Sequence, residues 1–252
     1  MKIIISPAKK MKTDTDFLDY YQLPQQIKET EILLSYLKKL TYGEIKSIWK
    51  CNDKIAGLNY ERIQKMDLYH NLTPAILSYE GIQYQYMAPR VFTAEEFSYI
   101  ETHLRIMSGF YGILRPFDGV VPYRLEMQAK LQGRNLNSLY EFWNGKLAQQ
   151  LFSESSCIVN LASKEYSKCI SEYLDSSVGL ITCIFGEKLG ERIVEKGTQV
   201  KMARGEMVRF MAEKQIKSVE EIKKFDRLNY VFVDDLSNDN RYVFIKKDDK
   251  RF

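Results

Sequence analysis

The chain has 252 residues, of which 45% are hydrophobic and 28% are charged, and its formal net charge is +4. This composition is that of an ordinary globular protein with one sizeable core or two small ones, and a charge this mild does not by itself indicate an anionic partner. The lack of any run of about 18 apolar residues argues against a membrane span. The starting stretch MKIIISPAKK also lacks the long apolar region of a signal peptide. We therefore expect a cytoplasmic protein without a membrane partner.

Cysteine and histidine are too sparse to predict a metal site. The four cysteines show no CxxC spacing, so free thiols are expected in a reducing compartment. The two histidines, His70 and His103, lie far apart and outside any ligand motif. We expect neither a bound metal nor a cofactor.

Strands and helices are expected to alternate irregularly along the chain. Strands are expected at residues 2–6, 157–162 and 179–185, and a β-hairpin at residues 229–236 and 241–247. Helices are expected at residues 25–40, 42–50, 93–107, 138–151, 164–174 and 200–214. Thr93, Ser138 and Ser218 each stand three residues before a glutamate, the pattern of a capping box. These elements predict an α+β fold, built as a single compact unit over residues 1–252 with a small helical subdomain near residues 20–70.

One short stretch, SGFYGILRPFDGVVPYRLEM at residues 108–127, combines backbone-shaping residues with charge. Its two glycines permit unusual backbone shapes and its two prolines fix φ, so a shaped loop is expected. It carries charged and aromatic side chains: Arg115, Asp118, Tyr123, Arg124 and Glu126. Two interpretations are open. Either the arginines pair with the two acids in a structural connector, or they present guanidinium groups to an anion such as a phosphate.

Two further basic groups occur in SPAKKMK and VKMARGEMVRF. The first follows the N-terminal strand and holds Lys9 and Lys10; the second is expected to be helical and holds Lys201, Arg204 and Arg209. Each alone is typical of a solvated charged surface, and only convergence would indicate a site. We predict one basic cleft lined by residues from strand ends and shaped loops: Ser6, Lys9, Arg115, Tyr123, Arg124, Glu126, Asn160, Lys201 and Arg204. Ser163 is expected to line the same cleft.

Residues 41–66, TYGEIKSIWKCNDKIAGLNYERIQKM, fit the layout of a helix-hairpin-helix module. The break is expected at residues 56–59, where Gly57 and Asn59 would shape a hairpin whose amides bind a DNA phosphate without reading bases. Positive charge flanks it at Lys50, Lys54 and Arg62. An ordinary helix pair is the alternative.

Several long motifs in one order resemble the YaaA peroxide-stress family over almost the whole chain. They include IISPAKKM at 4–11, DKIAGLNYERI at 53–63 and HLRIMSGFYGILRPFDGVVPYRLEM at 103–127. The resemblance implies a cytosolic bacterial protein that protects cells from hydrogen peroxide and affects intracellular free iron. It also implies an unusual α+β fold with a basic cleft and a helix-hairpin-helix, and DNA binding with little sequence preference. Two departures are Lys10, where threonine is common, and Gln128, where glycine is common.

Three functions are open on the sequence. The leading one is a DNA-binding stress protein, in which lysines and arginines contact phosphates and Tyr123, Tyr111 or Trp49 stacks on an exposed base. The second is an enzyme acting on a nucleotide or nucleic acid in the same cleft, with Glu126, Glu165 and Tyr123 as candidate catalytic groups. The third is a protein-interaction scaffold. A pocket enclosing both glutamates would favour an enzyme, and an open basic groove would favour DNA.

Overall fold

A mostly parallel sheet of eight strands organises the computed structural model, which describes residues 1–131 and 137–247. Strand β1 (Lys2–Ile5) lies inside this sheet, between β5 (Leu104–Ser108) and β8 (Cys157–Leu161), and is parallel to both. From β8 the sheet continues in parallel through β9 (Gly179–Leu189) and β12 (Arg241–Lys246). Short antiparallel strands complete it: β6 (Gly112–Leu114) beside β5, β10 (Arg192–Val194) beside β9, and β11 (Tyr230–Phe232) beside β12.

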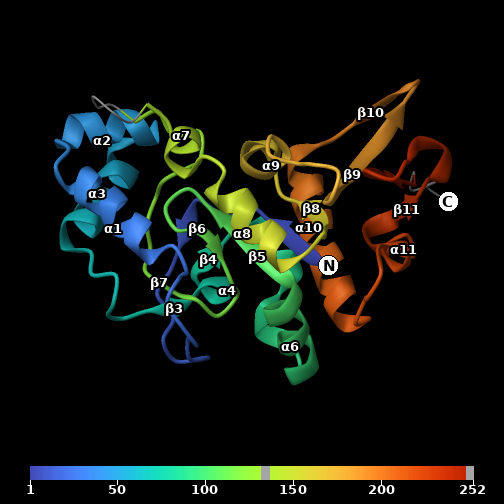
Figure 1. Cartoon of the computed structure of the whole chain (residues 1–252), viewed down its shortest axis with the longest axis horizontal. Helices are drawn as coiled ribbons and strands as arrows, with labels where there is room; N and C mark the ends of the chain where they lie inside the picture. The colour runs from blue at the N-terminus through green and yellow to red at the C-terminus, as the bar shows by residue number, and fades with distance from the viewer. Residues whose placement is uncertain (132–136, 248–252) are drawn as a thin grey trace.

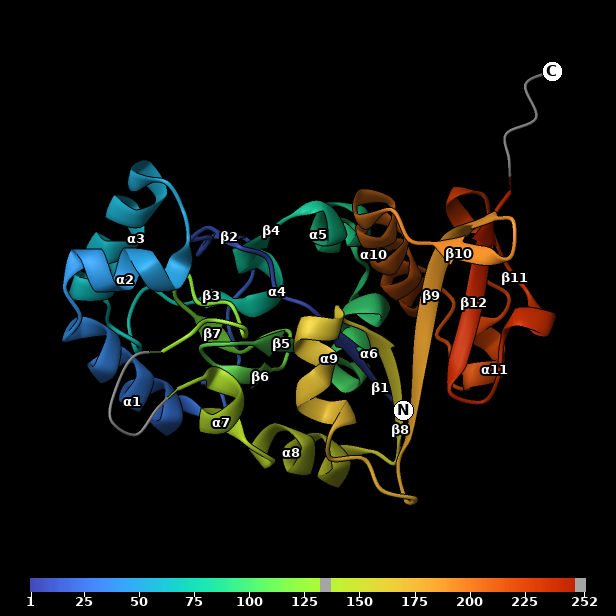
Figure 2. The same ribbon diagram turned by 90° about the horizontal axis from the view of Figure 1, so that it is seen from above.

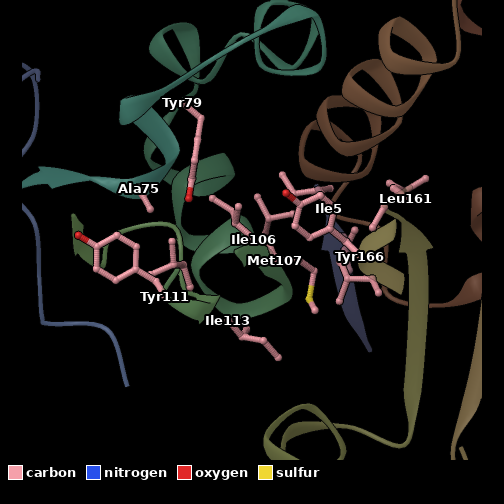
Figure 3. Close-up of a cluster of buried hydrophobic side chains, with 14 of the residues drawn as sticks. Ile5, Ala75, Tyr79, Ile106, Met107, Tyr111, Ile113, Leu161 and Tyr166 are labelled. Atoms are coloured by element: carbon pink, nitrogen blue, oxygen red, sulfur yellow. The ribbon is translucent and has the colours of Figure 1, made fainter. Parts of the chain in front are cut away.

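The sequence of β1 explains its central place. Three consecutive isoleucines are fully buried there, as expected for a parallel strand covered on both faces. The last of them, Ile5, is in register with Ile106 on one side and Leu161 on the other. Figure 3 shows the side chains of Ile106, Ile5 and Leu161 in one row across the sheet. Tyr166 lies close to Leu161. The core of the molecule therefore continues across the three central strands.

Helices surround this sheet and form both ends of the molecule. In Figures 1 and 2, α1–α3 gather at one end, and β10, β11 and α11 lie at the opposite end. No helix within residues 1–131 and 137–247 has both the length and the apolar character needed to cross a bilayer. The helix bounds are α1 (Ile27–Lys38), α2 (Tyr42–Trp49), α3 (Asp53–Lys65), α4 (Ala75–Ser78), α5 (Ile82–Met87), α6 (Ala94–His103), α7 (Leu139–Trp143), α8 (Lys146–Glu154), α9 (Lys164–Ser171), α10 (Gly197–Glu213) and α11 (Val219–Ile222).

Two short antiparallel ladders tie the loops to this framework. In one, β2 (Lys10–Met11) pairs with β4 (Tyr79–Glu80), which brings the loop after β1 beside the start of α5. In the other, β3 (Thr73–Pro74) pairs with β7 (Gly119–Val120). These contacts hold the shaped loop of residues 108–127 against the N-terminal part of the chain.

Most of the predicted elements are confirmed, and the mixed fold of strands and helices is as expected. The strands at 2–6, 157–162 and 179–185 are present, and β11 and β12 form the expected hairpin. The capping boxes of Thr93 and Ser218 have both reciprocal hydrogen bonds. Ser138 accepts the amide of Glu141 at the start of α7.

Two predicted helices have the wrong extent. The helix expected at 93–107 ends at His103, because every residue of Leu104–Ser108 is buried as strand β5 beside β1. The helix expected at 138–151 is divided at Asn144, whose φ of 45° lies in the left-handed region, so α7 and α8 are separate helices.

The predicted hairpin at residues 56–59 is wrong, because α3 runs unbroken through Gly57. The turn lies earlier: Lys50 ends α2 in the left-handed region, and the Asn52 side chain accepts the amide of Ile55 to begin α3. Asn59 faces the core, and its amide donates to the Ile55 carbonyl one turn earlier at 2.9 Å. Residues 42–65 are thus an ordinary helix pair with its turn at 50–52.

Candidate functional site

The carboxyl ends of β1 and β8 meet at the point where the strand order reverses. After β1 the chain builds β5 and β6 on one side, and it later returns to add β8, β9 and β12 on the other. In open α/β sheets, ligands bind in the crevice outside the carboxyl ends of the strands at such a topological switch point. Ser6 follows β1, and its hydroxyl accepts the backbone amide of Ser163 at 2.8 Å just before α9.

A pocket of about 420 Å³ opens beside these two serines. Its volume falls in the range of small-molecule sites and suits a ligand the size of a nucleotide. We call it the switch-point pocket. Five segments line it, and their residues are Ser6, Pro7, Ala8, Lys9, Lys10, Glu80, Gly81, Ile82, Gln83, Tyr84, Tyr123, Arg124, Leu125, Glu126, Ser163, Glu165, Tyr166, Lys201 and Arg204.

The charges around the pocket are unbalanced towards positive. Five lysines and arginines line it against three glutamates. Glu126 is shared between Lys9, at 3.2 Å, and Arg124, at 3.0 Å. Glu80 pairs with Lys10 at 2.8 Å. Three basic segments therefore line one pocket, together with the carboxylates that pair with them.

The shaped loop reaches the pocket by packing tightly against its own beginning. A Cβ atom on Gly109 would stand 2.5 Å from the carbonyl oxygen of Leu125, closer than real Cβ contacts allow. Glycine at position 109 is therefore what lets the segment around Leu125 lie there. That segment in turn places Arg124 and Glu126, with side chains 11% and 13% exposed, on the pocket wall.

Tyr123 takes part in a buried hydroxyl chain. Its hydroxyl lies 2.6 Å from the hydroxyl of Ser108 and 2.9 Å from that of Tyr79. Burial raises the pKa of Tyr123 to about 12, partly opposed by these hydrogen bonds. The hydroxyl is thus protonated near neutral pH and already engaged. The predicted stacking of bases does not fit, because Tyr123, Tyr111 and Trp49 are 5%, 1% and 2% exposed.

Glu165 is a carboxyl of the pocket whose pKa is raised. It lies in the first turn of α9, and one of its oxygens accepts the backbone amide of Gln128 at 3.2 Å. Burial raises the pKa of Glu165, the Gln128 amide opposes this, and the neighbouring charge of Glu126 raises it further. A carboxyl of this kind can hold or give up a proton near a bound ligand.

Helix α10 contributes two cations, one turn apart, from the same face. Both line the pocket, with Lys201 exposed and Arg204 partly buried. Within the described residues Arg204 has no ion pair, and its Nε is buried without a hydrogen-bond acceptor. Burial lowers the pKa of Arg204, with an opposing attraction from Glu195. A guanidinium that has a buried, unbonded Nε and no ion pair is well suited to an anionic ligand.

Two residues predicted for the cleft, Arg115 and Asn160, are not part of the pocket lining, and neither is Arg209 of the second basic segment. Arg115 belongs to a structural connector, since its Nε donates to buried Asp118 at 2.9 Å and its amide donates to the other carboxylate oxygen at 2.9 Å. Asn160 uses its amide on Thr182 and on the backbone of Ala162. Arg209 pairs with Glu213 along α10 at 2.7 Å.

The predicted DNA contacts of residues 42–65 lie apart from the switch-point pocket. Within the described chain, the pocket lining includes none of Lys50, Lys54, Gly57, Asn59 or Arg62. These residues belong to the end of the molecule formed by α1–α3 (Figure 1). Any role of these residues in DNA binding would be separate from the pocket.

Sequence reasoning missed Gln83. Its side chain is 7% exposed, lines the pocket from α5, and has a buried Nε2 without an acceptor in the described structure. The only sequence signal is a polar residue between the apolar Ile82 and Tyr84 in a short helix. Without the contact between α5 and α10 that signal has no meaning.

A second hollow of about 510 Å³ adjoins the pocket. The two share a wall made of Lys10, Glu80, Gly81, Ile82 and Tyr84. Two further cations, Lys12 and Arg90, line the second hollow, and both pair with Asp14.

The fold and site define an α/β protein with a charged, partly enclosed pocket at the switch point of a mostly parallel sheet. The family model described as peroxide stress protein YaaA matches residues 1–236. The chain is 56% identical to a UPF0246 protein of Agathobacter rectalis and 54% identical to one of Pediococcus pentosaceus, over 98% of this chain and 99% of each relative. The chain therefore belongs to the peroxide stress protein YaaA family.

Proposed function

We propose that this chain serves the peroxide-stress response in the cytoplasm by binding DNA through its phosphates, with little sequence preference, at the switch-point pocket. The observation that carries the proposal is Arg204, which has no ion pair among the described residues and whose Nε is buried without an acceptor, in a pocket lined by more cations than carboxylates. Phosphate groups satisfy such donors and carry no sequence information. The family description supplies the link to peroxide stress.

The second hollow supports a polymer as the ligand. Because it shares a wall with the pocket and is lined by Lys12 and Arg90, a strand can continue from one hollow to the next. A bound strand would pass over the exposed Lys10–Glu80 pair that separates them. The phosphate charges of the DNA on both sides of that wall would then add to the affinity of the protein for DNA.

Binding of duplex, single-stranded and branched DNA over a salt series tests this proposal. We expect the logarithm of affinity to fall linearly with the logarithm of salt concentration, and Lys201→Ala to reduce the slope by about one. The matched control is Lys168→Ala, whose lysine is exposed on α9 outside the pocket lining. Salt-independent binding, or equal losses in both variants, would contradict the proposal.

A protective effect linked to intracellular free iron is part of the same proposal, and its support is the family resemblance. Cells that lack the chromosomal copy should regain peroxide survival and a low free-iron signal in electron paramagnetic resonance when given the wild-type chain. Arg204→Ala should fail to restore either. If it restores both fully, the pocket is not the protective site.

An enzyme acting on a nucleotide or nucleic acid is the second candidate. It is favoured by the enclosure of Glu126 and Glu165 in one pocket, with the pKa of Glu165 raised by burial. Incubation with nucleotides and oligonucleotides, followed by mass spectrometry, should then show a product that Glu165→Gln fails to form. Unchanged substrates with the wild-type chain would remove this candidate.

A further inference from the structure

Three N–H donors that line the switch-point pocket have no acceptor among the described residues. They are Nε2 of Gln83, Nε of Arg204 and Nε of Arg124. Gln83 is more than nine-tenths buried, and the Arg124 side chain is 11% exposed. Buried donors without acceptors are rare because they lose hydration without a replacement. Three of them around one cavity indicate that a ligand supplies the acceptors.

Tight helix packing brings the donors of α5 and α10 together. A Cβ atom on Gly205 would stand 2.2 Å from the carbonyl oxygen of Gln83, so the two helices touch through their backbones at this point. Arg204 is the residue before Gly205, and both it and Gln83 line the pocket. The two donors are therefore carried on one rigid contact rather than on separate loops.

The carboxylates of the pocket already have partners of their own. Glu126 Oε1 is ion-paired with Lys9 and Arg124, although it accepts no hydrogen bond within the described residues, and Glu80 is ion-paired with Lys10. Glu165 accepts the Gln128 amide. The acceptor that Gln83 and Arg204 lack must therefore come from outside the chain.

We propose that Gln83, Arg204 and Arg124 form a terminal-phosphate site, which binds the phosphate monoester of a nucleotide, either free or at the end of a DNA strand. A monoester has three free oxygens for three donors and carries up to two negative charges near neutral pH. An internal phosphodiester has two free oxygens and one charge, and its strand must leave the pocket in both directions. Charge-assisted bonds from two guanidinium groups favour the dianion. The inference deepens the proposed function and rests on it only where the nucleotide belongs to DNA.

Calorimetric titration of the full chain tests the site with three probes: deoxyadenosine monophosphate, deoxyadenosine and inorganic phosphate. We expect the monophosphate to bind at least about tenfold more tightly than the nucleoside, and phosphate to compete with it. A short single-stranded oligonucleotide with a terminal phosphate should likewise bind about tenfold more tightly than the same strand with a terminal hydroxyl. Equal affinities within both pairs would overturn the site.

Substitution of Gln83 distinguishes binding at this site from a general electrostatic attraction between the protein and phosphate. In Gln83→Glu a carboxylate takes the place of the ligand beside Arg204, so we expect monophosphate affinity to fall by about tenfold or more while the melting temperature holds or rises. Gln83→Met keeps the size but removes the donor and should weaken binding severalfold. The control Gln149→Glu makes the same charge change at an exposed position of α8 and should leave the affinity for the monophosphate unaltered. Wild-type affinity in folded Gln83→Glu and Gln83→Met would overturn the proposal.

Failure of this site and failure of the DNA proposal give different results. If DNA does not bind but the monophosphate binds and depends on Gln83, the site stands and the proposed function falls. If oligonucleotides bind with a strong salt dependence that ignores both the terminal phosphate and Gln83, the proposed function stands and the site falls.

Discussion

Gly205 lies against the backbone of Gln83 so closely that any side chain there would collide with the Gln83 carbonyl oxygen, with a Cβ only 2.2 Å away. The next nearest atom, the Met87 amide nitrogen, would be 2.9 Å away. Both obstacles are backbone atoms of α5, which cannot turn aside as a side chain does. The contact between α5 and α10 therefore depends on this glycine.

Gly205→Ala should consequently destabilise the protein. Alanine in a helix gains up to about 1 kcal/mol over glycine, but separating two packed helices costs about 1–3 kcal/mol. We expect the packing cost to dominate, giving a net loss of about 2 kcal/mol in the free energy of unfolding measured with urea. Gly197→Ala in the same helix has nothing within 4 Å of the new Cβ and is the control. An equal or higher stability in Gly205→Ala would show that α5 moves freely.

Gly57→Ala should have the opposite effect. Gly57 lies within α3, and nothing lies within 4 Å of the position of its Cβ. With no collision, only the helix preference of alanine remains, so the free energy of unfolding should rise by about 0.5–1 kcal/mol. Thermal unfolding followed by circular dichroism measures the change. A destabilised variant would contradict the continuous helix and support the hairpin that the sequence predicts at residues 56–59.

The sequence reveals elements with a strong local signal and misses those decided by distant contacts. The apolar run of β1, the C-terminal hairpin and the three capped helix starts follow from neighbouring residues, and all are observed. The end of α6 at His103 has no such local signal, because pairing of the next three residues with β1 decides it. In α3, the Asn52 cap and the buried face at Ala56 outweigh the glycine that indicated a break.

The same division applies to the candidate site. The sequence placed Lys9 after a strand end, Arg124 on a shaped loop and Arg204 on a helix, and grouped them because charge patterns are visible in the sequence. All three line the pocket. The exclusion of Arg115 was not visible, since the sequence leaves open whether its partner is buried Asp118 or a ligand. Gln83 could not be predicted, because its role depends on the packing of two helices distant in sequence.

Asp118 should make stability depend on pH. It is fully buried, and burial raises its pKa to about 6, with Arg115 opposing the shift. As pH rises from about 4 to about 6, the unfolded chain loses this proton while the folded chain keeps it. The wild type should therefore lose about 3 kcal/mol relative to Asp118→Asn over this range, and no more above it. Urea unfolding of both proteins at several pH values measures the difference. If the difference in unfolding free energy between the two proteins changes in the opposite direction, the ion pair with Arg115 has a larger effect on the pKa of Asp118 than burial has.

Tyr123→Phe should lower stability without weakening binding of phosphate-bearing ligands. The change removes a hydroxyl that bonds to Ser108 and Tyr79 inside the protein, and unsatisfied buried partners cost about 1–3 kcal/mol. Chemical unfolding gives the stability, and calorimetry with deoxyadenosine monophosphate gives the affinity. A loss of affinity in a folded variant would instead make Tyr123 a ligand-binding group.

Glu126→Gln distinguishes the two proposed functions. The carboxylate of Glu126 neutralises Lys9 and Arg124 at the pocket wall, and glutamine can still accept from Arg124. If the pocket binds DNA phosphates, removing this charge should tighten binding severalfold at low salt and steepen the salt slope by up to about one. Glu172→Gln, which removes an exposed charge directly after α9 and outside the pocket lining, should change neither quantity. If Glu126 instead serves an enzyme as acid or base, the variant should bind nucleotide but form no product. Fluorescence anisotropy across a salt series, run beside product analysis, separates these outcomes, and weaker DNA binding in a folded Glu126→Gln protein would contradict phosphate binding at this wall.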